Sequence, residues 1–328
     1  MKSVRTIGLA VVLLTLVAGA VLVTMGRSRS SPVGFQALME MAADTQRDLT
    51  QLEKQATRVS DAEEMEVGAE IARRFTGWWP VAGRRVNQYV GEVGAALVPF
   101  VRRPGITYSF HVIDNPMINA FALPGGQVFV MRGMLEFVQT EAELAAILGH
   151  EMTHIDLRHC IELFQEELVV KKAADLAGRT VGGGLARFIV RATGQVAVLT
   201  WRIITMGYQR FQEFEADAQG WSLAVAAGYD PDAAMITFSR LDDQFGREPA
   251  PTRRNPTAEI ADAIKTSAGS YFHSHPPTRE RIQRLREIKE RSGGGLAGKT
   301  FYVGRGNLRD LTARRQREYG DPGERRTY

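Results

Sequence analysis

The spacing of apolar residues predicts helices along most of the chain. A helical period runs over 35–75, stops at Trp78-Trp79-Pro80 and resumes over 86–97. Two further periodic segments begin near Tyr208 and near Pro277, and each is long enough for a helix. These segments predict a mostly helical protein.

A short sheet is predicted among these helices. Residues 108–113 alternate between apolar and polar positions, as in a half-buried strand. Residues 118–123 and 128–131 are apolar runs on either side of Pro124-Gly125-Gly126, a turn sequence that predicts a β-hairpin. Together the elements predict an α+β fold that is mostly helical, with a small and mostly antiparallel sheet.

The N-terminus carries a targeting segment. Lys2 and Arg5 precede an almost wholly apolar run from Ile7 to Met25, which is long enough to span a bilayer as one helix. Ala18-Gly19-Ala20 is also typical of a signal-peptide cleavage site. We expect 1–30 to be a signal anchor, because the apolar run continues past that site, and a cleaved signal peptide is the alternative. The basic end then stays in the cytoplasm and the remainder faces the exported side.

A helix with a capping-box sequence at its start, Thr140 to Glu143, carries the clearest chemical motif of the chain. His150-Glu151-Met152-Thr153-His154 places two imidazoles about one helical turn apart, so that one metal ion can bind both. Glu151 projects from the neighbouring position, where its carboxylate can take a proton from a water on the metal. The motif predicts a zinc site with Glu151 as the general base.

Catalytic zinc normally has three protein ligands and one open position, so a third ligand is expected downstream. Glu213 and Asp217 share one face of the helix that is predicted to start near Tyr208. Glu213 is the candidate ligand, and Asp217 is the candidate acceptor for the far nitrogen of a ligand imidazole. Glu215 points elsewhere, which predicts a solvated position.

Composition narrows the chemistry of this site. Cys160 is the only cysteine, so an intramolecular disulfide or a thiolate cluster is excluded and the metal must be held by histidine and carboxylate. We expect Cys160 to be a small buried residue, and His111, His159 and His273 to be structural or surface residues that point away from the metal. The net charge of +4 is accounted for by a basic tail, which argues against nucleic acid as a partner.

Four segments resemble successive blocks of metallopeptidase family 48. They are NAFALPGGQVFVMRGML (119–135), EAELAAILGHEMTHIDLRH (141–159), RFQEFEAD (210–217) and SHPPTRERIQRL (274–285). The resemblance covers about 68–285 in the order of the family. That family includes the type I CAAX prenyl proteases, the HtpX-like heat-shock proteases and periplasmic relatives. With a single hydrophobic segment, this chain is most similar to the periplasmic group.

The resemblance implies a zincin-like fold with one zinc ion per chain. By that resemblance His150, His154 and Glu213 are the zinc ligands, Glu151 is the catalytic base, and Asp217 supports the ligands from behind.

Two further features have roles in this interpretation. Zinc endopeptidases hold an extended substrate against an exposed strand edge by main-chain hydrogen bonds. The candidate edge consists of Asn119, Ala120, Phe121, Ala122 and Leu123. His275 stands before two prolines at a predicted helix start, which can aim its imidazole into the cleft. It is either a hydrogen-bond donor to the oxyanion or a fourth zinc ligand in a resting state.

Taken together, the sequence predicts a zinc metallopeptidase domain over 35–291, followed by a Gly-rich and then basic tail over 292–328 outside the core. The expected activity is cleavage of internal peptide bonds in unfolded or misassembled proteins that are exported or membrane-associated, in protein quality control. The expected location is the bacterial inner membrane facing the periplasm, or the periplasm itself after cleavage. The alternatives are a zinc-containing, membrane-tethered chaperone or assembly factor with little proteolysis, and an exopeptidase.

Overall fold

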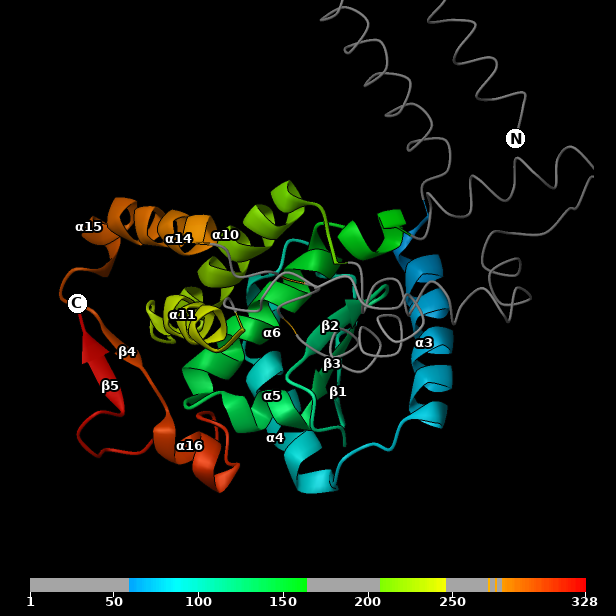
Figure 1. The fold of residues 1–328 in the computed structure, drawn as a ribbon, viewed down its shortest axis with the longest axis horizontal. Coiled ribbons are helices and arrows are strands. Elements are labelled where there is room, and N and C mark those ends of the chain that lie inside the picture. The colour runs from blue at the N-terminus through cyan, green and yellow to red at the C-terminus, as the bar shows by residue number, and fades with distance from the viewer. Residues whose placement is uncertain (1–58, 164–206, 246–270, 272–274, 276–278) are drawn as a thin grey trace, which may run out of the picture. The chain divides into compact units, whose positions relative to one another are not determined.

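The computed structural model describes residues 59–163, 207–245, 271, 275 and 279–328 (Figure 1). The elements discussed here lie in one compact unit formed from 60–161 and 184–328. In chain order they are α3 (Asp61–Trp78), α4 (Arg84–Ala95), η1 (Val98–Phe100), β1 (Ser109–Ile113), β2 (Ala120–Leu123), β3 (Gln127–Met131), α5 (Arg132–Phe137), α6 (Glu141–Asp156), α10 (Arg210–Ala226), α11 (Ala233–Phe245), α14 (Arg279–Arg291), α15 (Gly293–Leu296), β4 (Thr300–Tyr302), α16 (Arg305–Asp310) and β5 (Arg325–Thr327).

Helix α6, which carries the predicted metal motif, runs through the interior of the fold. Every residue of this helix is buried, and it packs against α4, α10, α11 and the sheet. A helix that is covered on all sides has no face directed to solvent. Its histidines and carboxylates are therefore held in the protein interior, where each polar atom requires a partner.

Two glycines set the distance between α6 and α10. A Cβ atom on Gly149 would lie 2.7 Å from the carbonyl oxygen of Gly220, and a Cβ atom on Gly220 would lie 2.7 Å from the backbone nitrogen of His150. Packed atoms do not approach so closely, so glycine is required at both positions for the two backbones to meet. The contact lies directly beside the first histidine of the motif.

The strands β1, β3 and β2 form a three-stranded sheet in that order. Strands β2 and β3 pair antiparallel with Leu123 opposite Gln127, which confirms the predicted hairpin. Gly125 and Gly126 turn the chain between them with φ angles of 72° and 92°, in the region that favours glycine. Strand β1 pairs with β3 in parallel, so the sheet is mixed.

Helices α3 and α6 pack on opposite faces of this sheet (Figure 1). On one face, Phe75 of α3 meets Phe121 and Phe129 edge to face, with ring centroids 5.3 and 5.1 Å apart. On the other face, Ala122 and Val128 belong to the hydrophobic core that includes α6. Because successive side chains of a strand point to opposite faces, strands covered on both sides are apolar throughout.

The predicted capping box of α6 forms only in part. Thr140 Oγ1 accepts a hydrogen bond from the backbone N–H of Glu143 at 3.1 Å, as expected. The Glu143 carboxylate does not return a bond to Thr140. It accepts from the backbone N–H of Gln139 at 3.3 Å, from Thr237 at 3.3 Å, and from the guanidinium of Arg240. A charge-assisted bond to a guanidinium is stronger than the backbone contact that the box would provide.

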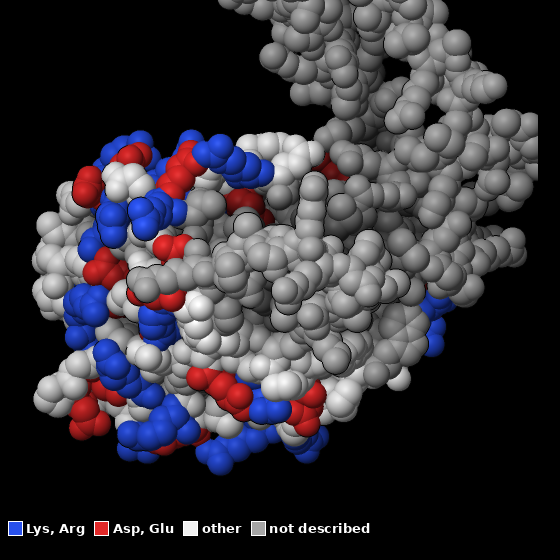
Figure 2. All heavy atoms as spheres, in the orientation of Figure 1, with Lys and Arg blue, Asp and Glu red and all other residues white. Residues whose placement is uncertain are grey.

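The residues after 291 form part of the core, so the expectation of an appendage is wrong here. Leu296, Phe301 and Tyr302 are buried in the main hydrophobic cluster. Several basic residues of this segment are paired with nearby acids, and Figure 2 shows Lys and Arg mixed with Asp and Glu on the visible face. The sequence after 291 is dominated by glycine and arginine, so its few apolar residues did not indicate that this segment packs against the core.

The same segment caps the N-terminal end of α6. The N–H groups of Glu141 and Ala142 donate to the carbonyl oxygens of Gly304 and Val303, each at 3.0 Å. These donors have no partner within the helix, so the C-terminal segment satisfies them. Burial raises the pKa of the Glu141 carboxyl group to about 7. The start of the metal-motif helix is thus fixed by residues more than a hundred and sixty positions away in sequence.

Within the described residues, no helix is both long and apolar enough to cross a membrane. The apolar run from Ile7 to Met25 and His273 lie outside the described residues. The membrane anchor therefore stays a prediction.

Candidate metal centre

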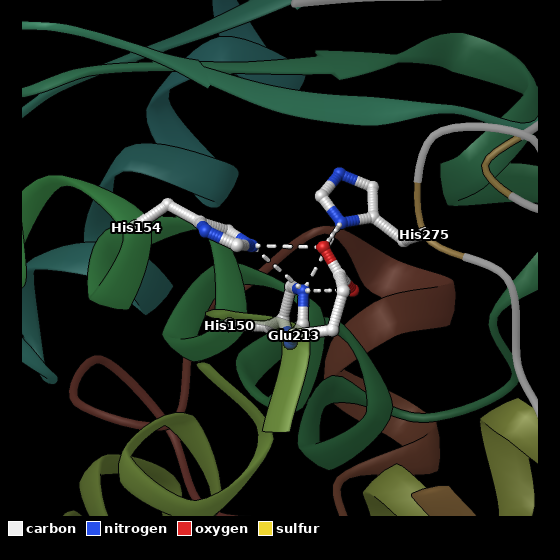
Figure 3. Close-up of side chains that lie close together, drawn as sticks. All are labelled: His150, His154, Glu213 and His275. Carbon is white, nitrogen blue, oxygen red and sulfur yellow. Dashed lines mark hydrogen bonds and ion pairs between the residues drawn. The ribbon is translucent and has the colours of Figure 1, made fainter. Parts of the chain in front are cut away.

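Four side chains from three parts of the chain converge in the interior, as Figure 3 shows. His150 and His154 come from α6, Glu213 from α10, and His275 from the segment before α14. Each offers a ligand atom, these atoms lie within 4.8 Å of one another, and all four residues are buried. The two Nε2 atoms of the α6 histidines are 3.1 Å apart. The structure thus brings together the residues that the sequence singled out for metal binding.

Glu213 reaches both histidines from the first turns of α10. Its Oε1 lies 3.5 Å from His154 Nε2, and its Oε2 lies 3.4 Å from His150 Nε2. Gln209 and Gln212 form a reciprocal capping box that fixes the start of α10 immediately before Glu213. The fixed start of α10 and the contact between Gly149 and Gly220 together place this carboxylate opposite the histidine pair.

His275 closes the cluster from the side of the sheet. Its Nδ1 lies 2.9 Å from Glu213 Oε1 and 3.2 Å from His150 Nε2. The backbone N–H of His275 donates to the carbonyl of Tyr271 at 2.8 Å, and the N–H of Tyr271 donates to the carbonyl of Ile118 at 2.7 Å. The Tyr271 ring also stacks on the imidazole, with centroids 4.7 Å apart. These contacts connect His275 to the chain that enters β2.

Asp217 and Arg281 lie behind the converging side chains. Asp217 Oδ1 is 3.1 Å from His150 Nδ1, and a proton on Nδ1 beside this carboxylate leaves the lone pair of the ring on Nε2. Arg281 donates to Asp217 from Nε and Nη2 at 2.7 and 2.6 Å. Its Nη1 lies 2.9 Å from Glu213 Oε2. One guanidinium therefore contacts two carboxylates of the centre.

The sequence analysis did not single out Arg281. On α14 it stands four positions before Leu285 and seven before Ile288, in line with the apolar stripe of the helix, and it is only 2% exposed. An arginine on the buried side of an amphipathic helix requires an internal carboxylate. That position in the pattern was the signal that could have found it.

Glu151 is fully buried beside the cluster. Its Oε1 lies 3.6 Å from His275 Nε2, and neither carboxylate oxygen has a hydrogen-bond partner among the described residues. Burial raises the pKa of Glu151 to about 7. A carboxyl group with a pKa near neutrality can both accept and release a proton at physiological pH.

The pKa values of His154, Glu213 and Asp217 are shifted in directions that suit metal binding, whereas the carboxylates of Asp217 and Glu213 outweigh the effect of burial and raise the pKa of His150. Burial lowers the pKa of His154 well below its usual value, so the imidazole is neutral. Burial also opposes ionisation of Glu213, but His275 and Arg281 outweigh it and hold the pKa of Glu213 well below its usual range. The pKa of Asp217 is lowered in the same way, by Arg281 against burial. Neutral imidazole and ionised carboxylate are the forms that bind metals.

The charges of the centre fit a divalent cation. The carboxylates of Glu213 and Asp217 share the guanidinium of Arg281, which leaves one negative charge, and the buried Glu151 adds a second when it is ionised. Buried charges persist only when they are compensated. Imidazole nitrogen and carboxylate oxygen are also preferred ligands of zinc. A divalent cation would both neutralise the interior and occupy the point where the donor atoms meet.

His159 was expected to point away from the histidine pair, and this expectation is wrong, because His159 contacts the far nitrogen of His154. His159 Nδ1 is 3.0 Å from His154 Nδ1, and its Nε2 is 3.3 Å from Glu215 Oε2. The expectation assumed a continuing helix, but α6 ends at Asp156. Arg158 has a left-handed φ of 67°, which turns the chain back toward the metal histidine. Glu215 has a side chain that is 55% exposed, as predicted.

Cys160 is buried, as the sequence analysis expected. Its Sγ lies 3.0 Å from the hydroxyl oxygen of Tyr208, whose ring stacks on His154 with centroids 3.7 Å apart. His111 contacts Gln127 at 3.0 Å within the sheet and has a structural place there.

The candidate substrate strand is an edge strand of the described sheet. All four residues of β2 are buried, and the carbonyl of Asn119 accepts from the N–H of Met131. Because bonding directions alternate along a strand, Ala120 and Ala122 direct their backbone groups away from β3. The side-chain amide of Asn119 is buried and has no hydrogen-bond partner in the described part of the chain.

Two histidines of an HExxH helix that meet a distant glutamate, beside a buried carboxylate, define the class of zinc metallopeptidases. The model of Peptidase family M48 matches residues 84–289. The chain belongs to this family of zinc-dependent metallopeptidases.

Individual relatives have names that agree with this class. The mitochondrial metalloendopeptidase OMA1 of Schizosaccharomyces pombe is 28% identical over 201 residues, which are 61% of this chain and 52% of that protein. The beta-barrel assembly-enhancing protease of Escherichia coli is 26% identical over 216 residues, covering 62% and 44%. The mitochondrial metalloendopeptidase OMA1 of Bos taurus is 33% identical over 144 residues, covering 42% and 28%. The matched region thus spans about half or less of each relative.

Proposed function

We propose that this chain is a zinc-dependent endopeptidase that acts on exported or membrane-associated proteins in protein quality control. The observation that carries this proposal is Glu151, a buried carboxylate next to the metal-binding side chains that lacks a hydrogen-bond partner among the described residues. Burying such a group costs free energy. A chaperone that only binds zinc has no use for it, so Glu151 favours the enzyme over that alternative.

In this proposal His150, His154 and Glu213 hold the metal and Glu151 acts as the general base. Zinc, when bound, polarises the scissile carbonyl group and makes a neighbouring water more acidic. Glu151 takes the proton of that water, holds it and passes it to the leaving amine. The pKa of about 7 suits both steps, because the carboxylate must gain the proton and then lose it.

Asp217 and Arg281 keep these groups in place. Asp217 fixes the tautomer of His150 by accepting its Nδ1–H at 3.1 Å. Arg281 holds Oε2 of Glu213 at 2.9 Å, so that Oε1 stays turned toward His154 and His275. Neither residue contacts the substrate in this proposal, so both are positioning residues.

In this proposal His275 acts as a fourth ligand rather than as a donor to the oxyanion. Its Nδ1 points into the cluster, 2.9 Å from Glu213 Oε1, while its Nε2 faces Glu151 at 3.6 Å. Catalytic zinc keeps three protein ligands and one open position for water or substrate. A fourth imidazole fills that position, so His275 keeps the centre closed and must move before a peptide is cut.

An extended substrate would add to the edge of β2. The backbone groups of Ala120 face away from β3 and provide hydrogen bonds for strand addition, whereas the carbonyl oxygen of Ala122 accepts from Cys160 Sγ at 3.6 Å and would have to exchange that partner. The buried amide of Asn119 provides one further donor and acceptor at the entry to this strand. Recognition through the main chain depends little on substrate side chains. It therefore suits unfolded or misassembled proteins, whose backbone groups are accessible.

The proposed location is the exported side of a bacterial inner membrane. The apolar run over 7–25 supports it, as does the similarity to a beta-barrel assembly-enhancing protease. Mass spectrometry of the mature N-terminus distinguishes an anchor from a signal peptide. A mature chain that begins at Val21 in the soluble fraction would make the enzyme periplasmic.

Digestion of an unfolded protein tests the proposed reaction. The purified full chain is incubated with zinc and a casein-like substrate, and the products are sequenced by mass spectrometry. Internal cuts support the endopeptidase. Stepwise shortening from one end identifies an exopeptidase, and an intact substrate with stoichiometric zinc identifies a metal-binding chaperone.

A further inference from the structure

The ring of His154 is held at three points, and only one of them belongs to the proposed metal site. Its Nε2 faces the convergence point of the donors. Its Nδ1 lies 3.0 Å from Nδ1 of His159, and its face is covered by the stacked ring of Tyr208. His159 is 4% exposed, so this contact is made in the protein interior. The second metal histidine is thus backed by another histidine, whereas His150 is backed by a carboxylate.

The positions of the protons follow from these distances. If Nε2 of His154 holds a metal, its lone pair is used there and the ring proton is on Nδ1. That proton is donated to His159 Nδ1, which must carry a lone pair. The proton of His159 is then on Nε2, which lies 3.3 Å from Glu215 Oε2. One arrangement of protons satisfies the three groups in sequence.

We propose that Glu215, His159 and His154 form a hydrogen-bonded relay that orients His154 toward zinc and strengthens its binding. This proposal rests on the proposed role of His154 as a ligand. A ligand imidazole whose far N–H has an acceptor is fixed in rotation and is a stronger base toward the metal. His159 is therefore a positioning residue that acts through His154.

The backbone conformation just after the C-terminal end of α6 brings His159 to His154. Arg158 has a φ of 67°, a left-handed conformation that is unfavourable for a residue with a side chain. The Arg158 guanidinium lies 3.2 Å from Asp61 and 3.5 Å from Glu64 of α3, and these ion pairs offset that cost. Without this reversal, His159 would continue along a helix and point away from His154.

The two links of the relay differ in exposure and so in expected strength. The contact between His154 and His159 is buried, and its loss leaves a donor without an acceptor. Glu215 has a side chain that is 55% exposed, so water can replace it and salt screens its charge. Changes at His159 are therefore expected to exceed changes at Glu215.

Zinc affinity of full-length variants tests the relay without reference to activity. The variants are His159→Asn, which keeps an acceptor oxygen near the position of Nδ1, His159→Phe, which keeps the size of the ring, and Glu215→Gln. The matched control is His111→Phe, which removes a histidine that contacts Gln127 away from the centre. Affinity is measured by competition with a chromophoric chelator, and the melting temperature of each metal-free protein reports folding.

We expect His159→Phe to weaken zinc binding about ten- to a hundredfold and His159→Asn to recover most of that loss. Glu215→Gln should weaken binding about two- to fivefold, and His111→Phe should have no effect. If His159→Phe does not fold, His159→Gln replaces it, since its longer amide places the polar atoms near Nε2 and misses His154. Equal affinity in wild type and all His159 variants would overturn the relay. A wild-type chain that holds no zinc would overturn the proposed function instead.

Discussion

Arg281 and Glu213 share a buried ion pair in which Nη1 of the arginine lies 2.9 Å from Oε2 of the glutamate. The same guanidinium holds Asp217 with its other two nitrogens and lies over the ring of Phe238, 4.6 Å from its centroid. Asp217 Oδ1 in turn lies 3.1 Å from Nδ1 of His150. A single side chain from α14 therefore orients Glu213 of α10 directly and His150 of α6 through Asp217.

Replacing Arg281 should damage stability and metal binding together. Arg281→Leu leaves two buried carboxylates without their cation and should lower the free energy of unfolding by about 3–5 kcal/mol. Arg281→Lys keeps the charge but loses the planar fork, so its effect should be smaller. Denaturant unfolding and zinc analysis measure both effects. Arg284→Lys, on the half-exposed side of the same helix, is the control and should behave as wild type. An unchanged Arg281→Leu would show that the ion pairs contribute nothing.

Glu151→Gln should retain zinc but lose about two to four orders of magnitude in turnover. The amide cannot accept the proton of the attacking water, so general base catalysis is removed while the proposed ligands stay in place. Turnover on a casein-like substrate and zinc content are measured on the same folded preparation. Near-normal cleavage by Glu151→Gln would refute the proposed mechanism.

Glu213→Ala and Asp217→Ala should lower zinc binding to different extents, because Glu213 is the proposed ligand and Asp217 only orients His150. Loss of Glu213 removes a ligand atom and should lower zinc occupancy strongly. Loss of Asp217 removes only the acceptor for His150 and should weaken affinity by roughly ten- to a hundredfold. Metal analysis after dialysis against a chelator ranks the two variants. Tightly held, stoichiometric zinc in Glu213→Ala would mean that another residue is the third ligand.

His275→Ala should raise basal cleavage or self-cleavage if His275 fills the fourth position. Its removal opens that position to water while three ligands remain. The measurement is the rate of casein-like substrate cleavage and of self-cleavage at equal zinc content. A drop in kcat with zinc retained would instead support a donor to the oxyanion. Unchanged turnover, zinc and self-cleavage would remove His275 from the site.

Glu141 should make stability fall as the pH rises from about 4.5 to 7. Its pKa is raised from 4.5 to about 7 in the folded state by burial, so folding favours the protonated form. This contribution is fully present below pH 4.5 and is lost above pH 7. Glu141→Gln keeps an oxygen for the bonds from Tyr229 and Arg314 but does not titrate.

The variant should therefore gain about 2–3 kcal/mol in unfolding free energy relative to wild type between pH 5 and pH 8. Urea unfolding of both proteins at the two pH values gives this difference directly, since other titrating groups contribute equally. Parallel pH profiles would mean that Glu141 is not protonated in the folded protein.

Features that depend on local sequence could be predicted. The hairpin at 124–126 followed from its turn residues, and the spacing of the HExxH motif placed His150 and His154 on one helix face, because helix geometry is fixed over a single turn. The mostly helical α+β fold class is also confirmed. Four consecutive residues contain the geometry of a turn and five contain that of the ligand pair, so no distant contact is needed to infer either.

Features that depend on distant contacts could not be predicted in the same way. The approach of His159 to His154 depends on the left-handed backbone of Arg158, a conformation that non-glycine residues seldom adopt. The Arg158 side chain also forms an ion pair with Asp61 of α3. The place of Phe301 and Tyr302 in the core depends on contacts of their segment with the N-terminal start of α6, some hundred and sixty residues earlier. In both cases the stabilising partner lies far along the chain.

The contact between Gly149 and Gly220 determines how far the metal centre can vary. Because the two ligand-bearing helices meet backbone to backbone, their separation does not depend on the rotamer of any side chain. Adding even one methyl group at either position would move His150 and Glu213 apart without altering any ligand. The metal specificity of this protein is therefore partly a property of its main chain, and attempts to accept a larger ion would begin at these glycines rather than at the donors.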